Sequence, residues 1–203
     1  MALGDPYASL DELKAYLSIP DVNEDDQLTD ALESASRGVE QFTGRQFNDA
    51  GAASARVYYP EHGCRVEVDD FHTTTGLVVE TDTGDDGTYE TEWASTDYQL
   101  EPLNGIVDGV TGWPYREVVA VEGRRFPTCS KRAPVQVTAR WGWAEVPAPV
   151  KQATLIVAAE TFKLSEAPFG VAGFDGFGVV RVRDNPMAAR KLAPYRRRVV
   201  LLA

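Results

Sequence analysis

The amino-acid sequence predicts an α+β fold in which a helical core is interrupted by an inserted antiparallel β domain and followed by a C-terminal extension. Two segments, residues 28–47 and 150–164, repeat apolar side chains at the spacing of a helix. The stretch between them holds short runs of β-forming residues separated by glycine and proline. We therefore expect a discontinuous helical domain over residues 1–48 and 146–166, a β domain over residues 49–145 and an extension over residues 167–203.

The helix over residues 28–47 is the element around which we expect the fold to be organised. Its apolar face consists of Leu28, Ala31, Leu32, Ala35, Val39 and Phe42. Asp25 or Asp26 can cap its amino terminus, and Gly44 stands where a helix often ends in a left-handed conformation. Because alanines keep part of this face small, a second helix can approach closely. We expect residues 150–164 to be that helix.

A shorter helix is predicted to precede it. Ser9 and Glu12 match a capping box, in which each side chain accepts a hydrogen bond from the backbone amide of the other residue. The predicted inner face consists of Leu10, Leu13, Tyr16 and Leu17. Proline disfavours helical conformation in the residue before it, so Ile19-Pro20 is expected to end this helix.

The insert carries several strand signals, which predict a small antiparallel sheet or barrel. A hairpin is expected over residues 76–93, with Asp86-Gly87 at a tight turn. The other strands are expected within residues 56–59, 65–68, 98–102, 117–122 and 135–143. For Trp113-Pro114-Tyr115 and Trp141-Gly142-Trp143 we expect packing in the β core rather than stacking on bases, because few basic residues interleave with them.

Charge is unevenly distributed along the chain. The formal net charge of −11 argues against a general DNA-binding surface. Acidic residues dominate residues 1–30 and 61–108, whereas basic residues dominate residues 181–198. A molecule with an acidic body and a basic end can attract further copies of itself. A solvated acidic surface with a basic tail accounts for the charge equally well.

The sequence offers little support for an enzyme. It lacks G-x-S-x-G, a phosphate loop, H-E-x-x-H and C-x-x-C. One cluster of possible metal ligands comprises His62, Cys64, Asp69, Asp70 and His72. A zinc site would need a tighter constellation, and the second cysteine, Cys129, is distant in sequence. We expect no catalytic residues, metal or cofactor. No export signal or membrane-spanning run is recognisable, so we expect Cys64 and Cys129 to be reduced thiols; a disulfide between them is the alternative.

Three stretches of the sequence resemble the head-to-tail connector, or adaptor, proteins of long-tailed bacteriophages. They are YASLDELKAYLSIPD, DDQLTDALESASRGVEQFTGRQF and TARWGWAEVPAPVKQATLIVAAETFKLSEAPFGVAGF. The most specific features are the exit of the long helix, E-x-F-T-G-R-x-F, and the W-G-W-x-x-V-P entry to the later helix. The resemblance covers about half of the chain. Many members are shorter and mainly helical, so no role transfers to the β insert.

The resemblance implies a structural virion protein rather than an enzyme. Such adaptors sit beneath the portal as a ring, usually a dodecamer, continue the DNA channel and present a platform for the stopper. The implied partners are further copies of the chain, the portal protein, a stopper or tail-completion protein, and double-stranded DNA that passes without sequence-specific binding; no membrane is involved. The implied location is the virion neck, with assembly in the host cytoplasm. The alternatives are a stopper or tail terminator and, outside phage assembly, a metal-dependent enzyme using His62 and His72.

The C-terminal extension is the candidate assembly interface. Its residues of interest are Phe169, Phe174, Phe177, Arg181, Arg183, Arg190, Lys191, Arg196, Arg197 and Arg198. Pro186 is expected to open a short basic helix within it. Ordering such a segment costs about 1 kcal/mol or more per residue, so we expect it to dock on an adjacent subunit or the portal. Folding back onto its own helices is the alternative.

Overall fold

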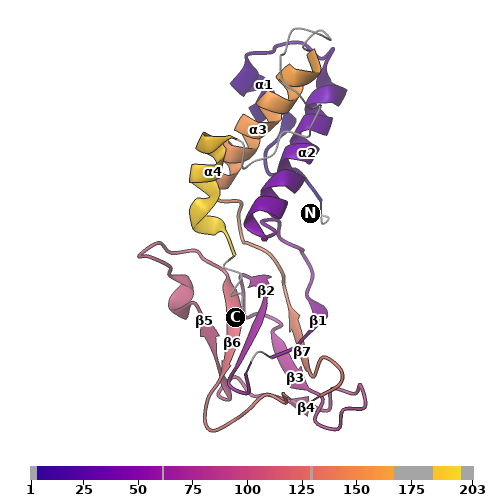
Figure 1. The fold of residues 1–203 in the computed structure, drawn as a ribbon, viewed down its shortest axis with the longest axis vertical. Coiled ribbons are helices and arrows are strands. Elements are labelled where there is room, and N and C mark those ends of the chain that lie inside the picture. The colour runs from indigo at the N-terminus through magenta and orange to yellow at the C-terminus, as the bar shows by residue number, and fades with distance from the viewer. Residues whose placement is uncertain (1–3, 61, 129, 167–184, 198–203) are drawn as a thin grey trace. The chain divides into compact units, whose positions relative to one another are not determined.

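The computed structural model describes residues 4–60, 62–128, 130–166 and 185–197, and the chain divides into two compact units (Figure 1). The β unit comprises residues 49–144. The helical unit comprises residues 4–48 and the described residues from Glu145 onward. The predicted α+β fold is confirmed, because all the strands lie in the chain between two helices of one helical core.

The helical unit contains four α-helices and a short 3₁₀ helix in the described residues. They are α1 (Leu10–Leu17), α2 (Asp25–Thr43), α3 (Ala148–Glu166), α4 (Pro186–Leu192) and η3 (Ala193–Tyr195). α2 packs against α3, α1 contacts both, and α4 lies on α3 (Figure 1). The predicted pairing of two helices distant in sequence is therefore confirmed.

Local signals explain most of the helix ends. Ser9 Oγ accepts from Glu12 N at 3.2 Å and Ser9 N donates to Glu12 Oε2 at 2.8 Å, so the predicted capping box is present. α2 ends at Gly44, whose φ of 67° is left-handed as predicted. The predicted Asp cap of α2 is wrong: Glu24 holds the N-cap position without a side-chain hydrogen bond. Asp25 and Asp26 instead lie in the first turn, where a negative charge stabilises the helix by interacting with the positive end of its dipole.

The predicted apolar face of α2 forms the centre of the helical core. Leu28, Leu32 and Val39 are fully buried against α3, which contributes Val150, Ala153, Val157, Ala158 and Phe162. The prediction for α1 is only partly right, since Leu13 is buried but Tyr16 is 55% exposed. The other two apolar residues predicted for this face, Leu10 and Leu17, are only partly buried.

The β unit contains two antiparallel sheets rather than one. The four-stranded sheet has the order β1-β7-β3-β4 and the three-stranded sheet the order β2-β6-β5. The strands are β1 (Ser54–Tyr58), β2 (Arg65–Phe71), β3 (Val78–Thr81), β4 (Thr91–Glu92), β5 (Tyr98–Glu101), β6 (Tyr115–Ala120) and β7 (Val135–Ala139). A 3₁₀ turn, η1 (Leu103–Gly105), follows β5.

Alternating residues of these strands form the core of the β unit. In β7, Val135, Val137 and Ala139 are buried while the residues between them are partly exposed. Trp141 and Trp143 are also buried, and Trp141 Nε1 donates to the Ser54 carbonyl at 2.9 Å. The predicted internal packing is therefore confirmed for Trp141 and Trp143, whereas Trp113 is only half-buried.

The hairpin predicted over residues 76–93 exists, but its tight turn is wrong. β3 and β4 pair in antiparallel fashion through Glu80–Glu92 and Thr81–Thr91, and residues 82–90 separate them. The longer loop is held by the buried Asp82, whose carboxylate accepts from Gly87 N at 2.7 Å and Asp86 N at 3.3 Å. A side chain from the strand end thus replaces the backbone pairing that a two-residue turn would provide.

Candidate assembly interface

The structure describes four of the ten residues predicted for an assembly interface. Arg190 and Lys191 lie in α4, and Arg196 and Arg197 follow η3. The others, Phe169, Phe174, Phe177, Arg181, Arg183 and Arg198, lie outside the described residues.

α4 is anchored on the helical unit of its own chain. Asn185 caps it by accepting from Met187 N at 3.0 Å and Ala188 N at 2.8 Å. The Asn185 side-chain amide also donates to Glu160 Oε1 of α3 at 2.5 Å. Ala188 and Leu192, four residues apart on one face, are fully buried. The predicted short helix after Pro186 is present, and for residues 185–197 the structure follows the alternative of folding back.

The residues after α2 hold the segment that follows α4. Arg45 Nε donates to the Tyr195 carbonyl at 2.7 Å, and the Tyr195 ring meets Phe47 edge to face at 5.9 Å. Arg197 N donates to the Thr43 carbonyl at 2.7 Å, which satisfies one of the last carbonyls of α2. This segment therefore closes the C-terminal end of α2.

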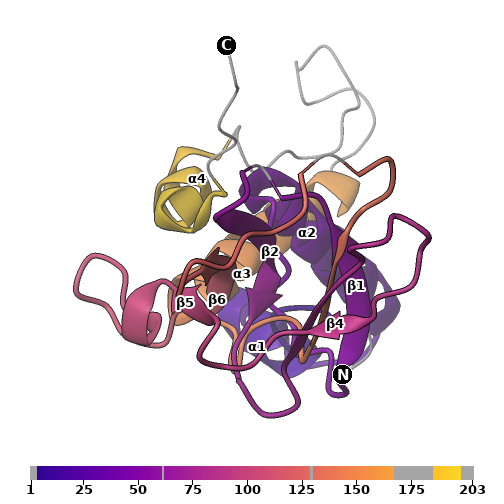
Figure 2. The ribbon, with the colours of Figure 1, turned by 90° about the horizontal axis from the view of Figure 1, so that it is seen from below.

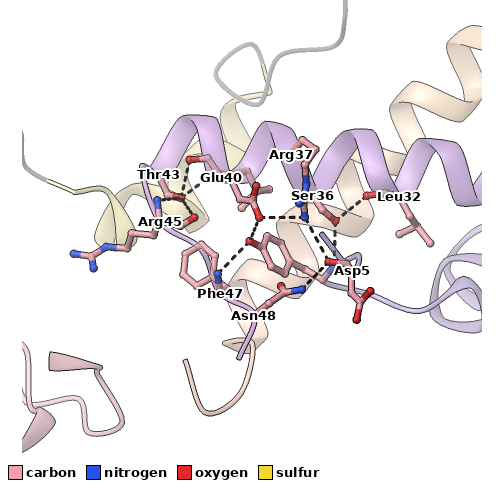
Figure 3. A network of polar contacts seen from close by, with 11 residues as sticks. Asp5, Leu32, Ser36, Arg37, Glu40, Thr43, Arg45, Phe47 and Asn48 are labelled. Carbon is pink, nitrogen blue, oxygen red and sulfur yellow. Dashed lines mark hydrogen bonds and ion pairs between the residues drawn. The ribbon is translucent and has the colours of Figure 1, made fainter. Parts of the chain in front are cut away.

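A buried polar network joins the N-terminal segment to the C-terminal end of α2 (Figure 3). Tyr7 Oη donates to Glu40 Oε1 at 2.5 Å and accepts from Phe47 N at 3.1 Å. Burial, followed by the hydrogen bond to Glu40, raises the pKa of Tyr7. Arg37 Nη2 lies 3.1 Å from the same Glu40 oxygen, and Asn48 Nδ2 donates to the Asp5 carbonyl at 3.0 Å. Two chain segments far apart in sequence thus meet at the exit of α2.

These contacts give a physical reason for the E-x-F-T-G-R-x-F motif. Glu40 accepts from Tyr7, Gly44 supplies the left-handed conformation and Arg45 binds the Tyr195 carbonyl. Phe47 is fully buried and Phe42 lies under the Arg196 guanidinium, 5.1 Å from ring centroid to Cζ. Sequence reasoning identified the motif and predicted the conformation of Gly44, but it assigned no role to Glu40, Arg45 or Phe47. The partners Tyr7 and Tyr195 are too distant in sequence to be paired with it by spacing.

The basic residues of α4 and its exit form a surface on the helical unit. Arg190 is exposed, Lys191 Nζ donates to Gln152 Oε1 at 2.8 Å, and Arg196 lies on Phe42. Within the described part of the chain, none of these three cations has a carboxylate partner. We call Arg190, Lys191 and Arg196 the basic surface. It can bind acidic side chains of another molecule.

The possible metal ligands of the β unit do not form a metal centre. Among the described residues, no group of three or more histidine, cysteine or acidic side chains is placed to hold a metal ion. Asp69 pairs with Arg56 at 2.7 Å, and Asp70 accepts from Trp143 Nε1 at 2.9 Å. His72 Nδ1 lies 3.4 Å from the Gly142 carbonyl oxygen, and Cys64 is an exposed free thiol. No described helix is long and apolar enough to cross a membrane.

Residues 7–93, from the segment before α1 through β4, match the model of a family described as phage gp6-like head-tail connector protein. The resemblance to phage head-tail connectors is confirmed. The matched family consists of structural connector proteins rather than enzymes, and the match covers 87 of the 203 residues of this chain. No curated protein sequence matches the chain.

Solved structures of gene transfer agent (GTA) particles share the fold over nearly the whole chain. A chain in the neck of an empty particle, computed with C6 symmetry, matches with a TM-score of 0.59 and 21% identity, over 99% of this chain and 95% of that one. A chain in the neck of the native particle, computed with C12 symmetry, has a TM-score of 0.54 and 17% identity, over 99% and 94%. A chain in the native virion has a TM-score of 0.55 and 20% identity, over 99% and 95%. The fold match thus includes the β unit.

Proposed function

We propose that this protein is the head-to-tail adaptor of a phage-like particle. It docks beneath the portal as a ring, continues the DNA channel and provides the platform for a stopper or tail-completion protein. It resides in the virion neck after assembly in the host cytoplasm. The observation that carries the proposal is the match of 99% of this chain to chains from particle necks computed with cyclic symmetry, together with the connector family match.

The charge distribution supports a ring. A closed cyclic ring is built head to tail, so each copy uses two different surfaces. The basic surface supplies one sign, and the acidic residues within 1–30 and 61–108 supply the other. Opposite charges on different surfaces favour contact between neighbours. The net charge of −11 also leaves few cations to hold DNA, which suits a channel through which a polyanion slides.

The two segments that flank α4 in sequence complete the proposed interface. Residues 167–184 contain Phe169, Phe174, Phe177, Arg181 and Arg183, and residues 198–203 begin with Arg198. Because α4 and η3 are fixed to α3 and to the exit of α2, both segments start from defined points on the helical unit. In our proposal they reach an adjacent subunit or the portal.

The test is the binding of the full-length chain to purified portal rings, imaged by electron microscopy. We expect an added ring of density, and we expect high salt to weaken its formation. The double variant Arg190→Glu/Lys191→Glu should bind several-fold less well, while Arg125→Glu/Lys163→Glu, which makes the same change in charge at exposed positions elsewhere, should bind as the wild type does.

A truncation from Arg181 onward is a less suitable test, because it also removes the buried Ala188 and Leu192 from the helical core. The charge variants keep both side chains. Circular dichroism should show unchanged helix content in each. Normal ring formation by Arg190→Glu/Lys191→Glu at low salt would refute the role of the basic surface, and failure of the wild type to bind portal rings would refute the adaptor proposal itself.

A further inference from the structure

The connection between β5 and β6 is a projecting loop ordered by backbone hydrogen bonds, which we call the arm (residues 102–114). Val107 and Val110 exchange both backbone hydrogen bonds, at 3.0 and 2.9 Å, around Asp108 and Gly109. Both turn residues have positive φ, 50° and 79°, as a two-residue hairpin turn requires. At the base, Trp113 N donates to the Gly105 carbonyl at 3.0 Å. Both views show the arm standing out from the three-stranded sheet (Figure 1 and Figure 2).

The arm exposes aliphatic side chains and almost no charge. Leu103, Ile106 and Val110 are 51%, 43% and 59% exposed. Asp108 at the tip is the one charged residue of the arm. Exposed apolar groups gathered on an ordered projection, in a unit that is otherwise acidic, are typical of a contact surface.

A second apolar surface lies on the outer face of the four-stranded sheet. In β1, Arg56 and Tyr58 face inward, with Arg56 Cζ 4.7 Å from the Trp141 ring centroid, so that Val57 faces outward. Val57 and Tyr59 are 51% and 61% exposed. Gln136 and Thr138 of β7 and Val78 and Glu80 of β3 continue this face, so Glu80 is its one acidic side chain on these strands. The pairs in register are Val57–Gln136, Ala55–Thr138, Val78–Thr138 and Glu80–Gln136. We call it the β1 face.

A positive charge stands at the rim of the β1 face. The Tyr59 hydroxyl donates to the Lys131 carbonyl at 3.2 Å, which places Lys131 beside the exposed tyrosine. Lys131 is exposed and forms no ion pair with the described residues. An apolar centre with a charged rim is the usual composition of a protein–protein contact.

We propose that the arm of one copy docks on the β1 face of the next copy in the ring. This proposal rests on the ring of the proposed function. Both surfaces stay exposed in the single chain, so the arm does not cover its own β1 face. They differ from each other, as the two halves of a repeating head-to-tail contact must. Asp108 on the arm and Lys131 at the rim of the face carry opposite charges. Asp85, whose carboxylate accepts from Lys131 N at 3.1 Å, lies at the same rim.

The first test is disulfide cross-linking in portal-bound rings of the full-length chain. Cys64 and Cys129 are replaced by serine, Val57→Cys is added, and Leu103→Cys, Ile106→Cys or Val110→Cys is combined with it in turn. A disulfide requires Cα atoms within about 7 Å, so cross-linking reports contact. We expect a ladder of covalent multimers for at least one pair, because each copy then links to two neighbours. An equal mixture of the two single-cysteine chains should stop at dimers.

A control pair of cysteines and an alternative binding partner for the arm complete this test. Val22→Cys, at an exposed position of the helical unit, combined with Val110→Cys should give no ladder. Rings that form normally without a ladder for any of the three pairs would overturn the docking proposal and leave the ring intact. Cross-linking of the arm to an added stopper protein instead of to a second copy would also overturn it. If the wild type forms no ring, the proposed function fails, and this proposal with it.

The second test reverses the charges. Asp108→Lys and Lys131→Asp should each lower the ring yield several-fold, because like charges then meet at every contact. An equal mixture of the two variants should restore the yield, since in an alternating ring every arm again faces the opposite charge. A mixture that assembles no better than the single variants, while circular dichroism shows both folded, would contradict the proposed contact.

Discussion

Replacing Tyr7 by phenylalanine removes one buried hydroxyl from the centre of the polar network at the exit of α2. The hydroxyl donates to Glu40 Oε1 at 2.5 Å and accepts from Phe47 N at 3.1 Å. A hydrogen bond to a charged group contributes about 1.5–3 kcal/mol, and a buried amide that loses its acceptor adds to the loss. Arg37 still compensates Glu40, and the edge-to-face contact of residue 7 with Phe47, 5.5 Å between centroids, is retained. We therefore expect a loss of about 2–3 kcal/mol.

The placement of the tryptophans allows this loss to be assigned to one unit. All four tryptophans lie in the β unit, at positions 93, 113, 141 and 143. Circular dichroism at 222 nm reports mainly the helices, and tryptophan fluorescence reports the β unit. In urea, where the free energy of unfolding of a unit of this size falls by about 1 kcal/mol per molar, this loss would lower the circular dichroism midpoint by about 2–3 M. The fluorescence midpoint should change less.

Tyr16→Phe is the matched control, because Tyr16 is exposed and its hydroxyl has no partner among the described residues. It should unfold within about 0.5 kcal/mol of the wild type. A loss below 0.5 kcal/mol for Tyr7→Phe, or an equal loss for both variants, would refute the assignment of stability to the buried hydroxyl.

Three further predictions follow from the same contacts. Leu192→Ala should lower the stability seen by circular dichroism by about 2–4 kcal/mol, whereas Met187→Ala on the exposed face of α4 should not; equal effects would contradict the burial of α4 on α3. Gly105→Ala should lower the fluorescence-detected stability more than Gly112→Ala. Both glycines have positive φ, but a Cβ at Gly105 would lie 2.8 Å from the Trp113 carbonyl oxygen, whereas a Cβ at Gly112 would have no atom within 4 Å. Because the pKa of Tyr7 is raised in the folded state, its contribution is full below its ordinary pKa near 10 and is lost as the pH rises above it. Between pH 10 and about 12, the wild type should therefore lose helical stability faster than Tyr7→Phe, and parallel pH profiles would contradict this.

Local spacing was enough to predict the helical core. The three- and four-residue repeat of α2 and the apolar composition of α3 identify two faces that need covering, and α2 and α3 do cover each other. The Ser9–Glu12 capping box and the left-handed Gly44 are equally local, because each depends on residues within one turn. Where the local signal was ambiguous, as between Asp25 and Asp26, the predicted cap was wrong, because Glu24 holds the N-cap position.

The roles of the motif at the exit of α2 could not be predicted in this way. Glu40 meets Tyr7, which lies 33 residues earlier, and Arg45 meets the carbonyl of Tyr195, which lies 150 residues later. No periodicity links such positions, since their contact depends on how three separate segments converge. The tight turn predicted after β3 was wrong because the Asp82 side chain accepts hydrogen bonds from the backbone of residues 86 and 87 and so stabilises a longer loop.

The sequence by itself determined the α+β class, the pairing of two helices across a β insert, the absence of an enzyme motif and the resemblance to head-tail connectors. Each of these depends on periodicity, composition or a contiguous motif, which a single chain displays along its length. Only the tertiary structure decided that the insert forms two sheets, that α4 lies on α3 of its own chain, and that the arm and the β1 face remain exposed. A short helix such as α4 carries only Ala188 and Leu192 as buried residues, and no pattern in seven residues specifies which apolar surface covers them.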